Sequence, residues 1–155
     1  LYAGVGTVGI GAASLGASEV VLFERDRDVH AIMQANIDEL DCGDTCRAVL
    51  ADALGPAVLA QAPRPVDIVF MDPPYAVMHQ EAMRQAVLAQ AARLPMIMAE
   101  KGWLVLRTPD PLGEEERSIP GLAGPEVHRY AEDMHVQLYF RDAGSIEEPR
   151  QEHDS

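Results

Sequence analysis

The stretch that decides the fold is GVGTVGIGAASLGASEVVLFE, which runs from Gly4 to Glu24. Its glycines at positions 4, 6 and 9 fit the spacing G-x-G-x-x-G, which permits a tight turn and a close approach of a ligand to backbone N–H groups at a helix start. Small and apolar residues from Ile10 to Leu15 continue as a helix that Gly16 can end, and 19–23 (EVVLF) is typical of a buried strand. The sequence therefore predicts a turn, a helix and a strand that together can bind a nucleotide.

Helical and extended patterns alternate through the rest of the chain. Residues 26–40 have apolar side chains at helical spacing, and Asp26 can cap the first turn of that helix. The other expected elements are a strand over 47–50, a short helix over 54–62, a strand over 66–71, a long helix over 80–100, a strand over 103–107, a loop over 109–125 and two closing strands over 127–134 and 135–140. This order predicts an α/β fold with a mostly parallel, doubly wound sheet and an antiparallel C-terminal hairpin.

The two ends of the chain are distinctive. Leu1-Tyr2-Ala3 resembles the end of a strand that enters the glycine turn, and a strand so short cannot stand alone. We therefore expect most of the first strand to lie upstream of Leu1, in a longer chain. We also expect one domain over residues 1–142, followed by an acidic, mobile tail over 143–155.

Composition narrows the class of protein. The 155 residues carry a formal charge of −13, which argues against a nonspecific grip on nucleic acid through clustered Lys and Arg. Cys42 and Cys46 make a poor zinc site without a second pair, and the five histidines have no metal spacing, so we expect reduced thiols and no metal. No apolar run is long enough to span a membrane, and no signal peptide is visible. We expect a cytoplasmic monomer.

Acidic residues follow the second and third expected strands, where ligands bind in such sheets. Glu24 lies about twenty residues beyond Gly4, where a carboxylate can accept both hydroxyls of a ribose. Asp52 could accept the amino group of an adenine while the Ala53 N–H faces a ring nitrogen, or it could cap the helix over 54–62. The pattern suits NAD and S-adenosylmethionine (SAM) equally. The cofactor-binding residues that we predict are Ala3, Gly4, Gly6, Gly9, Glu24, Arg25, Asp52 and Ala53.

The tetrapeptide Asp72-Pro73-Pro74-Tyr75, directly after the hydrophobic strand over 66–71, indicates the reaction. An exocyclic amino group of a base is a poor nucleophile, because its lone pair is delocalised into the ring. Two acceptors aimed at its N–H bonds, the Asp72 carboxylate and the Pro73 carbonyl, would partly restore that lone pair. Proline fixes φ and so holds both acceptors, and the Tyr75 ring offers a face on which a flipped base can stack. We predict Asp72, Pro73, Pro74 and Tyr75 as the catalytic residues.

With these motifs together, the chain resembles the class I SAM-dependent methyltransferases that act on amino nitrogens. Within them it is most similar to the bacterial 16S rRNA guanine-N2 methyltransferase family, through LYAGVGTVGIGAASLGASEVVLFERD, ANIDEL, ADAL, VDIVFMDPPY and HRYAEDMHVQLYFR, over residues 1 to about 142. Gly11 stands where that family usually has Glu. The resemblance implies SAM as the cofactor, a guanine N2 amino group as the methyl acceptor, and 16S rRNA or an assembling small ribosomal subunit as the partner.

Three other functions stay open. The tetrapeptide is shared with DNA adenine-N6 methyltransferases, the glycine turn with NAD-dependent oxidoreductases, and a non-catalytic RNA- or ribosome-binding protein could retain the fold. Arg107, at the end of the strand over 103–107, could meet a phosphate, but we expect it to form a salt bridge.

Overall fold

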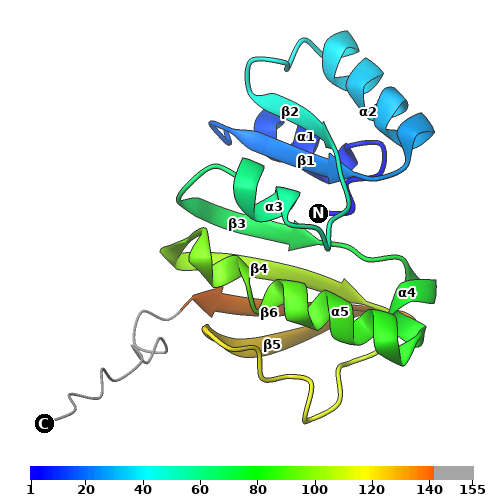
Figure 1. Cartoon of the computed structure of the whole chain (residues 1–155), viewed down its shortest axis with the longest axis vertical. Coiled ribbons are helices and arrows are strands. Elements are labelled where there is room, and N and C mark those ends of the chain that lie inside the picture. The colour runs from blue at the N-terminus through cyan, green and yellow to red at the C-terminus, as the bar shows by residue number, and fades with distance from the viewer. Residues whose placement is uncertain (142–155) are drawn as a thin grey trace, which may run out of the picture.

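In the computed structural model, which describes residues 1–141, the strands form two sheets that lie one above the other in Figure 1. A two-stranded parallel sheet pairs β1 with β2, and a four-stranded sheet has the order β3-β4-β6-β5. Strands β3 and β4 are parallel, whereas β6 runs antiparallel to both β4 and β5. The strands are β1 (Val20–Glu24), β2 (Cys46–Leu50), β3 (Val66–Met71), β4 (Met98–Thr108), β5 (Leu122–Ala131) and β6 (Met134–Arg141).

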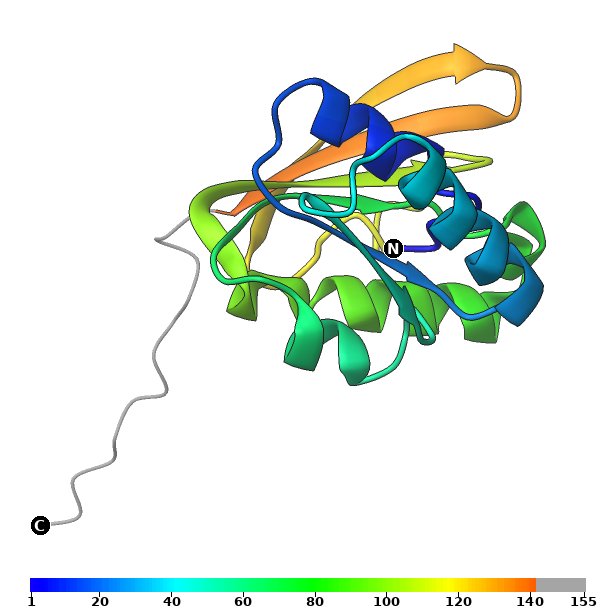
Figure 2. The same ribbon diagram turned by 90° about the horizontal axis from the view of Figure 1, so that it is seen from above.

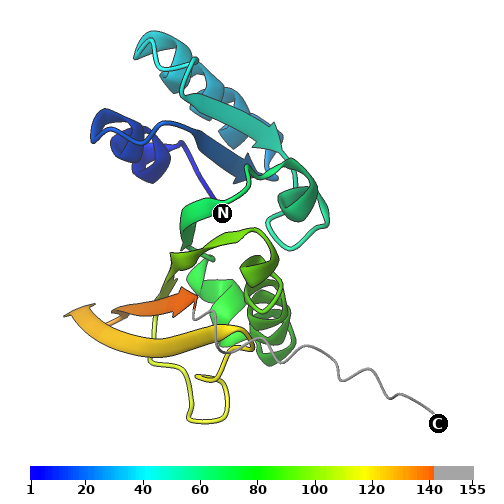
Figure 3. The same cartoon turned by 90° about the vertical axis from the view of Figure 1, so that its left-hand side faces the viewer.

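Helices cover both sides of these strands. The helices are α1 (Thr7–Ser14), α2 (Arg27–Glu39), α3 (Ala57–Gln61), α4 (Tyr75–His79), α5 (Glu81–Ala91) and the 3₁₀ helix η1 (Leu94–Met96). Seen from above in Figure 2 and from the side in Figure 3, α3 and α5 lie on one side of the strands and α1 on the other. The predicted α/β class and the antiparallel C-terminal hairpin are confirmed. Among the described strands, the pairs β1–β2 and β3–β4 are parallel and the two pairs made by β6 are antiparallel, so the strand pairing is mixed rather than mostly parallel. The acidic segment over 143–155 lies outside the described residues.

The first three residues run between the two sheets. The amino nitrogen of Leu1 donates to the Phe70 carbonyl at 2.6 Å, and the Ala3 N–H donates to the Phe23 carbonyl at 2.9 Å. These bonds join the carboxyl ends of β3 and β1 through one short segment, and the glycine turn follows directly. Strand β1 lies on one side of this segment, and β3 lies on the other side. This is the topological switch point at which open α/β sheets bind ligands.

Two apolar clusters hold the elements in place. The larger one packs α5 against the four-stranded sheet through fully buried side chains that include Met71, Val87, Leu104 and Leu106. The smaller one, made of Leu22, Met33, Ile37 and Cys46, packs α2 and the glycine turn against β1 and β2. Deleting a buried Leu or Met side chain typically costs about 2–5 kcal/mol, so these clusters fix the positions of the strand ends.

Local sequence signals correctly predicted the C-terminal end of α1 and the N-terminal end of α2. The Asp26 carboxylate accepts hydrogen bonds from the backbone N–H groups of Asp28 at 2.9 Å and Val29 at 3.1 Å, which confirms the predicted N-cap. Gly16 follows α1 and has a φ of +102°. A residue in the left-handed conformation often ends a helix, and glycine adopts this conformation most easily.

The long helix predicted over 80–100 is wrong in its second half. Helix α5 ends at Ala91, a 3₁₀ turn containing Pro95 follows, and β4 begins at Met98. Pairing of Met98 with Val66 of β3 overrides the helix propensity of this alanine-rich region. Strand β4 is therefore longer than the predicted strand over 103–107.

Smaller differences occur nearby. The expected loop over 109–125 already contains the start of β5, and the hairpin turns at 132–133 rather than at 134–135. A short helix, α4, begins at Tyr75, directly after the double proline, where no helix was predicted.

Candidate active site

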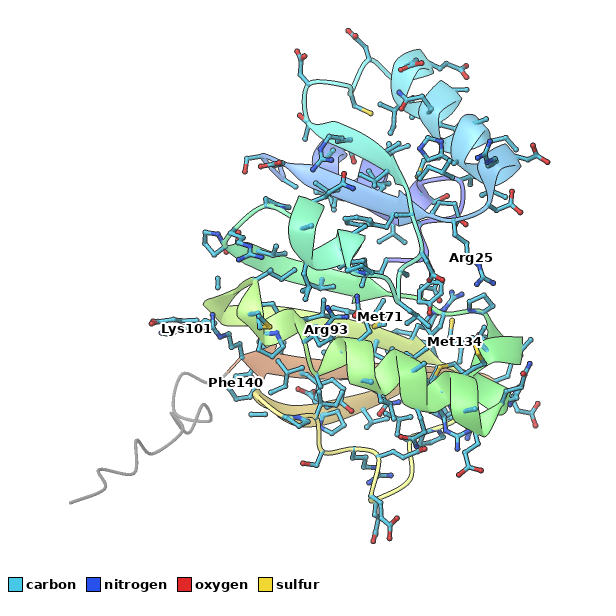
Figure 4. All side chains as sticks on the ribbon, in the orientation of Figure 1. Arg25, Met71, Arg93, Lys101, Met134 and Phe140 are labelled. Atoms are coloured by element: carbon cyan, nitrogen blue, oxygen red, sulfur yellow. The ribbon has the colours of Figure 1, made fainter. Side chains whose placement is uncertain are left out.

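A cavity of about 580 Å³ lies at the carboxyl ends of the strands, where the glycine turn and the Asp-Pro-Pro-Tyr tetrapeptide meet. Figure 4 shows Arg25 at this edge of the molecule, between the two-stranded sheet and α4. The cavity is lined by Tyr2, Gly4, Phe23, Glu24, Arg25, Val29, Ala53, Asp72, Pro73, Pro74, Tyr75 and Arg107. Its volume is in the range of small-molecule and cofactor sites.

The three glycines of the turn have different roles. Gly4 has a φ of +57° and lines the cavity, and a Cβ added there would meet no atom within 4 Å, so its backbone is open to a ligand. Gly6, with a φ of +93°, and Gly9 face the protein instead. A Cβ on Gly9 would lie 2.6 Å from Leu22 Cδ2, so this glycine permits close packing of α1 on β1.

Glu24 is held in place by the backbone around it. Its Oε2 accepts from the Gly4 N–H at 3.0 Å, and its Oε1 accepts from the N–H groups of Arg25 at 2.8 Å and Asp26 at 2.9 Å. A carboxylate has about four lone-pair sites, so these bonds leave one on Oε2 for a further donor. Glu24 thus joins β1 to the glycine turn and still presents an acceptor to the cavity.

The loop after β2 brings Ala53, but not Asp52, to the cavity wall. Asp52 is exposed, and its Oδ1 accepts from the Leu54 N–H at 2.9 Å, which forms a local turn rather than the N-cap of α3. Gln90, which is 2% exposed on α5, donates to the Ala53 carbonyl at 2.9 Å. This buried hydrogen bond fixes the loop, and sequence reasoning missed it because no local signal connects the two segments.

The Asp-Pro-Pro-Tyr tetrapeptide forms the opposite wall. The Asp72 N–H donates to the Leu1 carbonyl at 3.3 Å, and the Pro74 carbonyl accepts from the first turn of α4. Within residues 1–141 no donor bonds to the Pro73 carbonyl, so it remains available as an acceptor. Met78 of α4 is 3% exposed, and its burial anchors the short helix that carries Tyr75.

Arg107 reaches this wall from β4. Its Nε lies 2.6 Å from Asp72 Oδ1, and its guanidinium carbon lies 5.8 Å from the centre of the Tyr75 ring, within cation–π range. The Nε and Oδ1 atoms are shielded from solvent and do not form an aligned hydrogen bond, so the contact is an ion pair. The predicted salt bridge of Arg107 is confirmed.

Tyr2 is a cavity residue that sequence reasoning missed. It adopts a φ of +59°, and its hydroxyl is buried with no hydrogen-bond partner in the described part of the chain. Burial, assisted by the charge of Asp52, raises the pKa of Tyr2 to about 12. Phe23, Val29 and Arg107 also line the cavity. Phe23 and Val29 carry no sequence signal for a site, because apolar residues are common throughout folded proteins, whereas the position of Arg107 at a strand end did indicate this edge of the sheet.

The cavity brings together most of the predicted site. Gly4, Glu24, Arg25, Ala53 and the whole of 72–75 line it. Four predicted residues do not line the cavity, namely Ala3, Gly6, Gly9 and Asp52. The described range 1–141 contains no cluster of three or more His, Cys, Asp or Glu side chains that could hold a metal ion. Within the same range, no helix is both long enough and apolar enough to cross a membrane.

This fold and this cavity define a Rossmann-like class I methyltransferase domain. The model of the family Conserved hypothetical protein 95 matches residues 1–124, and the chain belongs to that family. It is 33% identical, over 92% of its length and 67% of the relative's, to the Ribosomal RNA small subunit methyltransferase D of Escherichia coli K12.

Solved structures agree with this fold. The Escherichia coli protein yhhF superposes with a TM-score of 0.69 at 28% identity, covering 91% of this chain and 72% of that one. The magnesium protoporphyrin IX methyltransferase of Synechocystis, solved with bound SAM, superposes with a TM-score of 0.66 at 18% identity, covering 90% of this chain and 67% of that one. At that identity the second likeness concerns the fold alone.

Proposed function

We propose that this protein transfers a methyl group from SAM to the exocyclic N2 amino group of a guanine in 16S rRNA. The observation that carries the proposal is the cavity that joins the glycine turn and Glu24 to the Asp-Pro-Pro-Tyr wall. The sequence similarity to a small-subunit rRNA methyltransferase supports rRNA as the substrate class. The guanine N2 position rests on the sequence resemblance described above.

The cofactor half of the cavity fits SAM. The open backbone at Gly4 allows close approach of the cofactor, the free lone-pair site of Glu24 can accept a ribose hydroxyl, and the Ala53 segment can face the adenine. When bound, SAM supplies an activated methyl group on a sulfonium, which is already a good leaving group. The protein therefore has no need to activate the methyl donor, and positioning can supply most of the rate enhancement.

The acceptor half would prepare the nucleophile. The Asp72 carboxylate and the Pro73 carbonyl can accept hydrogen bonds from the two N–H groups of an amino group, which raises the electron density on its nitrogen. Transfer of the methyl group would release S-adenosylhomocysteine, and the nitrogen would lose one proton to solvent. Stacking of a flipped base on the half-buried Tyr75 ring would contribute about 1–3 kcal/mol. The double proline holds these groups in place before the base arrives, so binding of the base costs little conformational entropy at this wall.

The test is methyl transfer from isotopically labelled SAM to 16S rRNA and to small ribosomal subunits from cells lacking this gene, followed by nucleoside analysis. We expect N2-methylguanosine as the product. Asp72→Asn replaces one acceptor by a donor at constant size, and we expect it to lower kcat by at least about 100-fold. Asp67→Asn, at the exposed amino end of the same strand, is the matched control and should remain active.

Other outcomes separate the alternatives. N6-methyladenine formed in duplex DNA would assign the chemistry to a different base. Binding of NAD without binding of SAM would identify an oxidoreductase. Full function in cells carrying Asp72→Asn would favour a non-catalytic ribosome-binding role. Comparing the methylation rates of free 16S rRNA and of small ribosomal subunits shows which assembly state of the RNA is the substrate.

A further inference from the structure

The register between β3 and β4 brings Arg107 beside the acceptor wall, by which we mean the wall of the cavity formed by residues 72–75. Met71, the last residue of β3, pairs with Leu106 of β4. Asp72 follows Met71 directly after the strand, and Arg107 follows Leu106 within β4. Side chains alternate along β4, and Leu106 and Thr108 are buried on the face that packs against α5. Arg107 therefore points to the opposite face, at the height of the Asp72 carboxylate.

Arg107 contacts both side chains of the acceptor wall at once. It pairs with Asp72 at 2.6 Å and stacks near the Tyr75 ring at 5.8 Å. The Asp72 side chain is 33% exposed and that of Arg107 is 42% exposed, so both remain partly accessible from the cavity. A planar guanidinium can hold a carboxylate and stack on an aromatic ring at the same time, which an ammonium cannot do equally well.

The other arginine of the cavity is held less closely. Arg25 Nη1 lies 3.9 Å from Asp52 Oδ2, and its side chain is 59% exposed. Arg25 belongs to the cofactor half, whereas Arg107 contacts the acceptor wall. In a chain with a net charge of −13, Arg107 also neutralises the carboxylate that an RNA phosphate backbone would otherwise have to approach.

We propose that Arg107 is a positioning residue for methyl transfer, an inference that rests on the proposed function. By holding Oδ1 of Asp72, the guanidinium fixes the direction of the carboxylate and leaves Oδ2 to accept the amino group of the base. Its contact with the Tyr75 ring fixes the stacking surface relative to that carboxylate. Arg107 acts through Asp72 and Tyr75 and does not itself touch the transferred methyl group.

The first test compares Arg107→Gln and Arg107→Lys with wild type, using SAM and small ribosomal subunits. Arg107→Gln removes the guanidinium and should lower kcat by about 10–100-fold, because misplacement of a catalytic group costs that much. KM should stay within about threefold of the wild-type value. Arg107→Lys keeps the charge and should recover part of the loss. Arg129→Gln, an equal charge change at an exposed position of β5, is the control and should match wild type. Equal SAM affinity in all variants shows that they are folded.

The second test is a double-mutant cycle with Asp72→Asn, measured in single-turnover assays. If Arg107 acts through Asp72, Arg107→Gln should cost less than about threefold in the Asp72→Asn background. An equal loss in both backgrounds would overturn the inference. So would a raised KM with a weaker salt dependence and an unchanged kcat, because that result identifies a phosphate contact. If wild type binds SAM but methylates no rRNA, the proposed function fails first and this inference with it.

Discussion

Gly9 and Gly11 lie in the same helix, α1, but a methyl group at each position would meet different surroundings. At Gly9 a Cβ would lie 2.6 Å from Leu22 Cδ2, 2.9 Å from Leu22 Cγ and 3.1 Å from Val20 Cγ1. At Gly11 no atom lies within 4 Å. The two Gly→Ala variants therefore separate the role of a glycine in close packing from its cost in helix entropy.

The expected magnitudes follow from these distances. Replacing a helical Gly by Ala stabilises a protein by about 0.5–1 kcal/mol where space allows, and this gain applies at both positions. At Gly9 the added carbon must displace Leu22, which is 3% exposed in the smaller core cluster, and overpacking of this kind costs about 1–3 kcal/mol. Gly11→Ala should therefore stabilise the protein, and Gly9→Ala should be less stable than Gly11→Ala by about 1–3 kcal/mol.

Urea unfolding of both variants and wild type measures the difference, provided that the m-values agree. Thermal unfolding should show Gly11→Ala above Gly9→Ala by about 2–4 °C for each kcal/mol. Because α1 follows directly from the glycine turn, Gly9→Ala should also weaken SAM binding, whereas Gly11→Ala should not. Equal stabilisation by both substitutions would refute the conclusion that Gly9 is required for packing.

Three further predictions concern other parts of the fold. Asp26→Ala removes the N-cap of α2 and should lower the free energy of unfolding by about 0.5–2 kcal/mol, measured in urea against Asp28→Ala. Leu106→Ala empties a fully buried position between β4 and α5 and should cost about 2–5 kcal/mol in the same assay; a loss below that range would show that the site collapses. Burial raises the pKa of Tyr139 to about 12, so the unfolded chain loses this proton first and stability should fall as pH rises from about 10 to 12. Tyr139→Phe should flatten that part of the pH profile, and an unchanged slope would contradict the assignment.

Local sequence signals predicted those elements whose ends are defined by local chemistry. The Asp26 cap, Gly16 after α1 and the apolar run of β3 all lie where their residue types indicated. The prediction failed where a distant partner decided the structure. Residues 98–100 have no strong strand signal of their own, and they become strand because β3 offers them a partner at Val66.

The sequence by itself determined which residues are the candidates for the chemistry, because strand ends, glycine spacing and the double proline are local features. It placed Glu24 and 72–75 at the same edge of the sheet, and the cavity confirms that juxtaposition. Only the tertiary structure decided that Gly4 faces the cavity while Gly9 packs on Leu22. It also decided that Arg107 pairs with Asp72, since the register of two strands depends on burying one face of each, and no short stretch of sequence encodes that.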